Sequence, residues 1–191
     1  MVPENMSDKK PMVLVFAGPN GSGKSTIKEW FEIVGEYTNA DDVVKATGMD
    51  NLAAAEWVDR MRDAAIELKA DFTFETVLSS DYKLKILKKA KEKGYFIKCA
   101  FVLTTSPWLN VARVAARVAQ GGHDVPSEKI IDRYYKALKN ISVLMNICDI
   151  MHVYDNTGDF PVRIIRKHKQ YVTIFPNENW DEKRIEALLY D

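Results

Sequence analysis

The feature that most constrains this chain is a glycine-rich stretch near its N-terminus, Gly18–Ser25, which matches G-x-x-x-x-G-K-[ST] in full. It follows a continuous apolar run, Met12–Ala17, that is typical of a fully buried strand in a parallel sheet. The residues after it, Lys24 to Val34, are predicted to form a helix with one apolar face. A strand, a glycine-rich turn and a helix in this order predict a P-loop.

A P-loop binds phosphate mainly through its backbone. Glycines let the chain curl so that successive N–H groups point inward, and the helix N-terminus adds partial positive charge. We expect Lys24 to reach the outer phosphates of ATP and to act in catalysis, and the Ser25 hydroxyl to ligate Mg²⁺. The residues predicted to bind ATP are Gly18, Pro19, Asn20, Gly21, Ser22, Gly23, Lys24, Ser25 and Thr26.

The remaining hydrophobic pattern alternates between strands and helices. Further strands are expected at 71–74, 95–103, 149–154 and 171–175, and further helices at 53–70, 81–93, 108–119, 127–147 and after residue 180. Gly94 is expected to end the helix before it in a left-handed conformation. This alternation predicts an α/β fold, a kinase-like P-loop NTPase built as a three-layer sandwich with a mostly parallel sheet and a helical lid.

Composition limits the partners and the compartment. Lys plus Arg and Asp plus Glu number 27 each, so no net field favours nucleic acid or a membrane surface as a partner. Cys99 and Cys148 lie in apolar runs, which favours buried free thiols and a reducing compartment. The polar start of the chain does not look like a signal peptide. We expect a cytoplasmic protein with a flexible tail at 1–10, a single domain at 11–191 and a lid at about 108–135.

The class of P-loop protein follows from motifs that the chain lacks. Transporter-type ATPases need an LSGGQ-like signature and an apolar strand ending in Asp-Glu, and GTPases need an Asn-Lys-x-Asp motif; the sequence contains none of these. A small kinase remains. Such an enzyme must place an acceptor hydroxyl and neutralise the charge on the transferred phosphoryl group.

Two carboxylate positions suit the acceptor. Asp41, beside Asp42, follows the P-loop helix at the point where a second strand should end, and Glu75 with Thr76 ends the strand that begins at residue 71. In a doubly wound sheet the ligand crevice lies at the carboxyl ends of the strands, so both carboxylates are expected to face the phosphates. The competing interpretation is that they cap the following helices.

The segment from Arg113 to Arg133 is expected to form the lid. Arg113 and Arg117 are four residues apart and therefore share a helix face, and the loop after them contains His123. A helix carrying Arg133 follows. This layout suits a lid that brings an arginine to the transferred group, although isolated arginines are more often solvated.

The ordered pieces FAGPNGSGKST, TNADD, FETVLS, KEKGYFIKCAFV, RVAARVAQGGHDVPSEKIIDRYYKAL and VYDN, over roughly residues 12 to 157, resemble the zeta-toxin-like kinases. The GGHDVP stretch is similar to the branch of small stand-alone predicted ATPases and kinases. The resemblance implies a P-loop kinase that uses ATP and Mg²⁺, and, in the toxins proper, UDP-N-acetylglucosamine as acceptor. It also implies a possible antitoxin-like protein partner.

The resemblance also implies residue roles. Asp41 falls on the catalytic base, Glu75 and Thr76 fall near the acceptor contact, and Arg117 falls on a lid arginine that stabilises the transferred phosphoryl group. This chain departs from the pattern of the toxins at two places, one near the acceptor and one in the lid. Thr76-Val77 stands where the toxins carry Gly-Thr, and His123 stands in place of a second lid arginine, whose charge Arg133 could supply.

Three alternatives to a kinase that phosphorylates a hydroxyl of UDP-N-acetylglucosamine stay open. The first is an ATP-binding and ATP-hydrolysing regulatory module that acts on a protein partner. The second is a nucleic-acid 5′-hydroxyl kinase, which the neutral charge balance disfavours. The third is a kinase for another sugar or metabolite, and the sequence alone does not separate this from the leading hypothesis.

Overall fold

A computed structural model describes residues 9–190 of the chain, which form seven strands and seven helices. The strands are β1 (Met12–Ala17), β2 (Glu36–Thr38), β3 (Phe72–Thr76), β4 (Phe96–Leu103), β5 (Ile150–Asp155), β6 (Val162–His168) and β7 (Tyr171–Ile174). The helices are α1 (Lys24–Lys28), α2 (Ala40–Thr47), α3 (Asn51–Leu68), α4 (Asp81–Glu92), α5 (Pro107–Ala119), α6 (Ser127–Ile147) and α7 (Glu182–Tyr190).

All seven strands join one sheet in the order β2-β3-β1-β4-β5-β6-β7. The pairs from β2 to β5 are parallel, and β6 and β7 add to the β5 side as antiparallel strands. The sheet is therefore mostly parallel, as the alternating pattern predicted.

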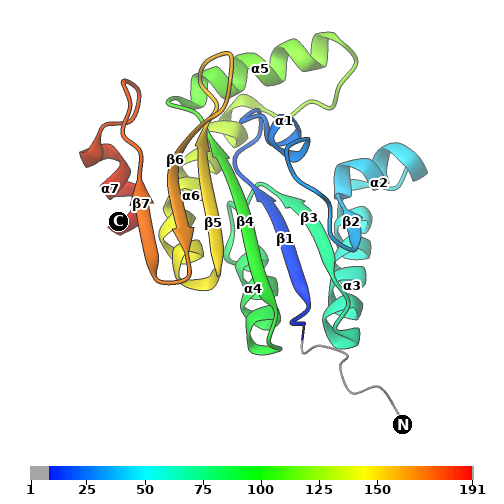
Figure 1. The fold of residues 1–191 in the computed structure, drawn as a ribbon. Helices are drawn as coiled ribbons and strands as arrows, with labels where there is room; N and C mark the ends of the chain where they lie inside the picture. Colours follow the sequence, from blue (N-terminus) through cyan, green and yellow to red (C-terminus); the bar gives the residue numbers. More distant parts are fainter. Residues whose placement is uncertain (1–8, 191) are drawn as a thin grey trace.

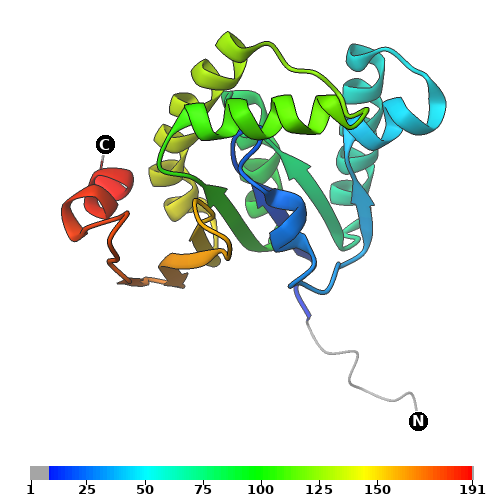
Figure 2. The same cartoon turned by 90° about the horizontal axis from the view of Figure 1, so that it is seen from above.

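Helices cover both faces of the sheet because the strands are apolar on both sides. Val13 and Val15 of β1 face a large core shared with α3, α4, α6 and α7. Leu14 and Phe16 face the other side, where α1 supplies Ile27. Figures 1 and 2 show α1 on one face, the larger helices on the other, and α5 crossing above the carboxyl ends of the strands. The predicted fold class, a three-layer P-loop kinase-like α/β fold, is confirmed.

The helix after the glycine-rich stretch is shorter than predicted. It was expected to reach Val34, but α1 ends at Lys28. Tertiary contacts replace the later turns: Phe31 packs edge-on against Phe16, with ring centroids 5.6 Å apart, and the Val34 amide donates to Thr73 Oγ1 at 3.1 Å. The residues after Lys28 therefore follow the sheet instead of a helical path.

Three other differences concern polar segments. Neither α2 nor β6 was predicted from the sequence, since each is short and rich in charged residues. In the helix predicted at 53–70, the apolar side chain of Leu68 is 79% exposed, whereas the charged side chain of Arg62 is only 2% exposed. By contrast, Gly94 follows the end of α4 with a φ of 86°, as predicted.

Some predictions concern location and chain organisation. Cys99 and Cys148 are both buried free thiols, as predicted. Over residues 9–190, none of the helices combines the length and apolar character needed to cross a bilayer. Most of the predicted tail, residues 1–8, lies outside the described residues. The cytoplasmic location and the single domain stay predictions.

Candidate active site

The glycine-rich stretch connects β1 to α1 in a conformation that only glycine tolerates at three positions. Gly18, Gly21 and Gly23 have φ values of 141°, 75° and 91°. A Cβ at Gly18 would lie 2.1 Å from the carbonyl oxygen of Val102 in β4, and one at Gly21 would lie 2.5 Å from the carbonyl oxygen of Asn110 in α5. The loop is thus pressed against the neighbouring strand and the helix above it.

The same loop presents donors that have no hydrogen-bond partner among the described residues. No backbone carbonyl among residues 9–190 accepts from the amides of Gly21, Gly23, Lys24 or Ser25. The Ser22 hydroxyl is buried and also has no hydrogen-bond partner among the described residues. Buried polar groups normally find partners, and a curl of free N–H groups at a helix start is an anion cradle. The loop therefore fits the phosphates of a nucleotide.

Lys24 lies inside this cradle. Its Nζ donates to the carbonyl oxygens of Gly18 at 2.8 Å and Pro19 at 3.1 Å, and lies 3.9 Å from Glu75 Oε1. Burial lowers the pKa of Lys24, whereas the carboxylates of Glu75 and Asp41 oppose that shift and Arg117 adds to it. The ammonium group therefore sits between the phosphate cradle and the two predicted acceptor carboxylates.

The backbone of Gly18 yields a direct test of the cradle. Replacing Gly18 with alanine should destabilise the fold by about 1–3 kcal/mol, because the new Cβ meets a backbone atom at a φ of 141°. ATP binding should be lost with the loop geometry. Chemical denaturation and calorimetric titration with ATP would measure the two effects. Gly158, whose added Cβ would meet nothing within 4 Å, supplies the control variant, and equal behaviour of the two variants would contradict this account.

The carboxylates reach the site from the ends of two adjacent strands. Asn39 caps α2 by accepting from the Asp41 amide at 3.0 Å, which leaves the Asp41 side chain exposed in the first turn. Glu75 lies in β3 and accepts from the Tyr37 hydroxyl at 3.1 Å. Burial and the nearby Glu75 raise the pKa of Tyr37, so the tyrosine stays protonated and donates. The residue that caps α2 is Asn39, so Asp41 is free for another role.

The loop after β3 forms the next part of the wall. Thr76 is buried, and its Oγ1 accepts from the Leu78 amide at 3.0 Å. Leu78 has a left-handed φ of 54°, and its carbonyl accepts from Asn140 of α6 at 2.7 Å. A bulky residue in this conformation is strained, and such strain is often found at functional sites. The turn presents Ser79 and Ser80 at the start of α4.

The predicted lid residues have different surroundings. Arg117 is exposed on α5 and donates to the His123 carbonyl at 2.8 Å, and Arg133 of α6 donates to Asn20 Oδ1 at 3.4 Å. Arg113 instead donates to the carbonyls of Asn156 at 2.8 Å and Thr157 at 3.3 Å, beyond the end of β5. Although Arg113 and Arg117 are four residues apart, the structure brings only Arg117 to the site.

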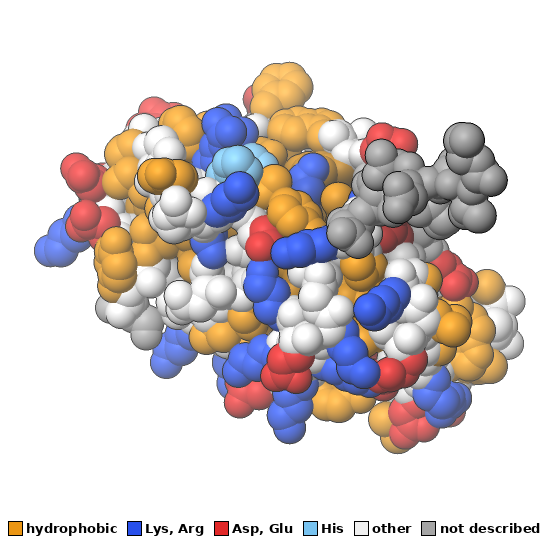
Figure 3. Space-filling model, turned by 60° about the horizontal axis from the view of Figure 1, so that its bottom comes forward, with side chains coloured by type: hydrophobic (Ala, Val, Ile, Leu, Met, Phe, Trp, Pro, Cys, Tyr) orange, Lys and Arg blue, Asp and Glu red, His pale blue; other side chains and the backbone are white. Residues whose placement is uncertain are grey.

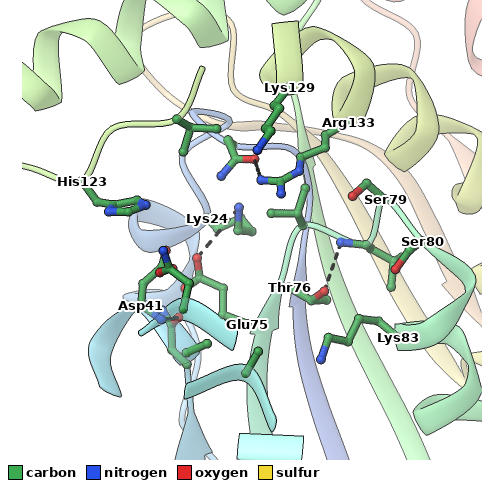
Figure 4. A pocket seen from close by; sticks show the side chains of 18 of the residues that line it. Lys24, Asp41, Glu75, Thr76, Ser79, Ser80, Lys83, His123, Lys129 and Arg133 are labelled. Carbon is green, nitrogen blue, oxygen red and sulfur yellow. Dashed lines mark hydrogen bonds and ion pairs between the residues drawn. The ribbon is translucent and has the colours of Figure 1, made fainter. Parts of the chain in front are cut away.

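These parts enclose one cavity of about 600 Å³. Figure 4 shows Lys24 near its centre, with Asp41 and His123 on one side and Ser79, Ser80 and Lys83 on the other. The predicted site residues that line it are Asn20, Gly21, Lys24, Asp41, Glu75, Thr76, Arg117, His123 and Arg133. The predicted residues outside this lining are Gly18, Pro19, Ser22, Gly23, Ser25, Thr26 and Arg113.

Three cationic residues that line the cavity were not predicted from the sequence: Arg62, Lys83 and Lys129. Arg62 and Asp59 are three residues apart in α3, a spacing that allows an ion pair but also occurs on many exposed helices. Nothing in the sequence marks Lys83 or Lys129 as different from other surface lysines.

The profile of one protein family, described as "Zeta toxin", matches residues 32–169, well over half of the chain. This chain belongs to the zeta toxin family. The matched stretch begins after the P-loop and includes the carboxylates, the cationic residues of α3 to α6 and the predicted lid. The resemblance based on the sequence motifs is therefore confirmed.

Individual proteins are also similar to this chain. An uncharacterised protein from Haemophilus influenzae is 29% identical over 128 residues, which cover 63% of this chain and 91% of that protein. A chain in the AvrRxo1-ORF1:AvrRxo1-ORF2 complex with sulphate ions is similar in structure, with a TM-score of 0.69 and 13% identity. The match covers 95% of this chain but only 64% of the AvrRxo1 chain, so this protein spans less than two thirds of that relative.

A chain from the PezAT chromosomal toxin–antitoxin system of Streptococcus pneumoniae is also similar, with a TM-score of 0.58 and 18% identity. That match covers 97% of this chain and 89% of the PezAT chain. Likeness at these identities establishes the fold. This member of the zeta toxin family therefore has a P-loop kinase-like fold, and its activity and acceptor are separate questions.

Proposed function

We propose that this chain transfers the terminal phosphoryl group of ATP to a hydroxyl group of a small molecule. The observation that carries the proposal is a cavity in which the Lys24 ammonium lies between a phosphate cradle and the carboxylates of Asp41 and Glu75. A phosphate grip next to proton acceptors, in a space open to a second molecule, is the arrangement that phosphoryl transfer requires.

The proposed chemistry assigns each group one role. The cradle and Lys24 bind the phosphates, and the Ser25 hydroxyl in the first turn of α1 is the side chain placed for Mg²⁺, which would offset phosphate charge when bound. Asp41 accepts the proton of the acceptor hydroxyl while the hydroxyl oxygen forms a bond to the γ-phosphorus of ATP. The bond from that phosphorus to the bridging oxygen breaks, and ADP leaves with the bonding electron pair.

Arg117 is proposed to stabilise the phosphoryl group during transfer. The side chain is exposed and, among residues 9–190, makes one hydrogen bond, to the His123 carbonyl, so it can turn toward the phosphates at little cost. Arg117→Ala should lower kcat about 10²-fold with a small change in the KM for ATP. Arg113→Ala, which alters a guanidinium outside the cavity, is the control. Steady-state kinetics in which both variants lose the same activity would refute the assignment of Arg117.

The acceptor proposed from the family resemblance is the sugar of UDP-N-acetylglucosamine or a related metabolite. The test is to incubate the protein with ATP, Mg²⁺ and UDP-N-acetylglucosamine and to measure the product by mass spectrometry. A mass increase of one phosphate, absent when ATP is omitted, would support this acceptor. An unchanged mass with ATP still bound would exclude it and direct the same assay to a metabolite extract.

A second candidate is a regulatory module that hydrolyses ATP while it binds a protein partner. It is favoured by the fact that the similar AvrRxo1 chain was solved in a complex with a second protein and that PezAT is a toxin–antitoxin system. An antitoxin-like partner of this chain would then cover or regulate the cavity. Hydrolysis that needs no acceptor and responds to such a partner would favour this candidate.

A further inference from the structure

A second group of charges lies in the cavity, away from the phosphate cradle. Asp59 of α3 accepts from Arg62 Nη1 at 2.9 Å and from Lys83 of α4 at 2.6 and 2.7 Å. Arg62 also donates to the hydroxyl of Thr38 at 2.9 Å and to its carbonyl at 3.1 Å, at the end of β2. The group therefore connects two cavity-lining helices to the strand that precedes Asp41.

The charges of this group do not balance. Arg62 and Lys83 carry two positive charges, and Asp59 is the one carboxylate within ion-pair distance of either among residues 9–190. The side chains of Arg62 and Asp59 are 2% and 9% exposed, and that of Lys83 is 21% exposed and faces the cavity. Burial lowers the pKa of Lys83, and the Asp59 carboxylate opposes this shift. An uncompensated charge in a buried site is costly, so a negative group bound there would be stabilising.

The surroundings add more positive charge and hydroxyl groups. Lys129 and Arg133 of α6 also line the cavity. Ser79 and Ser80 lie beside Lys83 in Figure 4, and the Ser80 side chain makes no capping hydrogen bond to α4. The acidic residues Asp41 and Glu75 lie nearer Lys24. Elsewhere the charges are mixed: on the face shown in Figure 3, Lys and Arg are interspersed with Asp and Glu.

We propose that Lys83, held in place by Asp59, binds an oxyanion group of the acceptor. The acceptor is then a molecule that carries a phosphate or carboxylate in addition to its reacting hydroxyl, and a neutral sugar or nucleoside is a poor substrate. This inference rests on the proposed phosphotransfer function, because it assumes that the half of the cavity beyond Lys24 holds the acceptor. Lysine suits the task, since its ammonium is a compact point charge with three donors.

The binding test does not depend on turnover. Protein saturated with Mg²⁺ and a non-hydrolysable ATP analogue is titrated with inorganic phosphate or acetate while the backbone amide resonances of Ser79, Ser80 and Lys83 are followed by NMR. We expect saturable shifts that Lys83→Gln weakens roughly 10-fold or more and that Lys83→Arg largely preserves. Lys85→Gln, on the exposed side of the same helix, should behave like the wild type. The preferred anion would distinguish phosphate from carboxylate.

Unshifted resonances, or equal binding by wild type and Lys83→Gln, would overturn the inference. A kinetic measurement separates this failure from failure of the proposed function. If phosphorylated product forms, Lys83→Gln should raise the acceptor KM roughly 10- to 100-fold and leave the ATP KM unchanged. Product with an unaltered acceptor KM in Lys83→Gln would refute the role of Lys83 alone. Anion binding at Lys83 without any product would instead refute the phosphotransfer function alone.

Discussion

Replacing Lys24 with methionine is expected to lower kcat about 10³-fold or more, because the group that offsets charge on the transferred phosphoryl is removed. Methionine keeps most of the aliphatic stem, so the buried packing of the side chain is largely retained. The loss should therefore appear in turnover, while thermal denaturation shows a modest change. ATP affinity should also fall, since Lys24 lies within the cradle that binds the phosphates.

The control for this prediction is Lys45→Met, which changes an exposed lysine on α2. Its kcat and ATP affinity should match those of the wild type. Lys24→Met with kcat within a few-fold of the wild-type value would contradict the role given to Lys24. A large loss in both variants would show that the assay responds to stability and not to the site.

Asp41→Asn is expected to lower kcat about 10³-fold with little change in ATP affinity, because an amide cannot accept the acceptor proton as a carboxylate does. The substitution keeps the size of the side chain. The cap of α2 comes from Asn39, which accepts from the Asp41 backbone amide and is unaffected by the change. Kinetics together with calorimetric titration of ATP would separate the effect on turnover from the effect on binding.

Asp42→Asn provides a matched control one residue away. Asp42 is exposed in the first turn of α2 and lines a separate apolar crevice, not the cavity that contains Lys24. Its turnover should be close to that of the wild type. If Asp41→Asn lost ATP affinity and turnover to the same degree, Asp41 would contribute to nucleotide binding and another group would have to accept the proton.

Much of the central fold could be predicted from the sequence because its signals are local. The strand Met12–Ala17 is apolar throughout and was predicted with the observed bounds, and the helix at 127–147 was also predicted correctly. The P-loop required only a short motif and its flanks. Because ligands bind at the carboxyl ends of the strands in such sheets, Asp41 and Glu75 were predicted to face one site, and both line the cavity.

The features that the sequence did not predict depend on distant contacts. The end of α1 at Lys28 is set by Phe31 and Val34 packing on the sheet, and no Gly or Pro marks it. The buried cluster of Asp59, Arg62 and Lys83 looks in the sequence like ordinary surface charge, because its partners come from three separate elements. Arg113 and Arg117 lie four residues apart on α5, yet only Arg113 donates hydrogen bonds to the loop after β5.

The central claim, transfer of phosphate from ATP to a small-molecule hydroxyl, is tested most directly by following the γ-phosphate itself. The protein is incubated with Mg²⁺, γ-labelled ATP and a metabolite extract, and the label is separated into inorganic phosphate, protein and small molecules. We predict that label accumulates in one small-molecule species, that Lys24→Met abolishes it, and that little label appears as inorganic phosphate. Label found only as inorganic phosphate, at a rate independent of the extract, would contradict the account and favour an ATP-hydrolysing regulatory module.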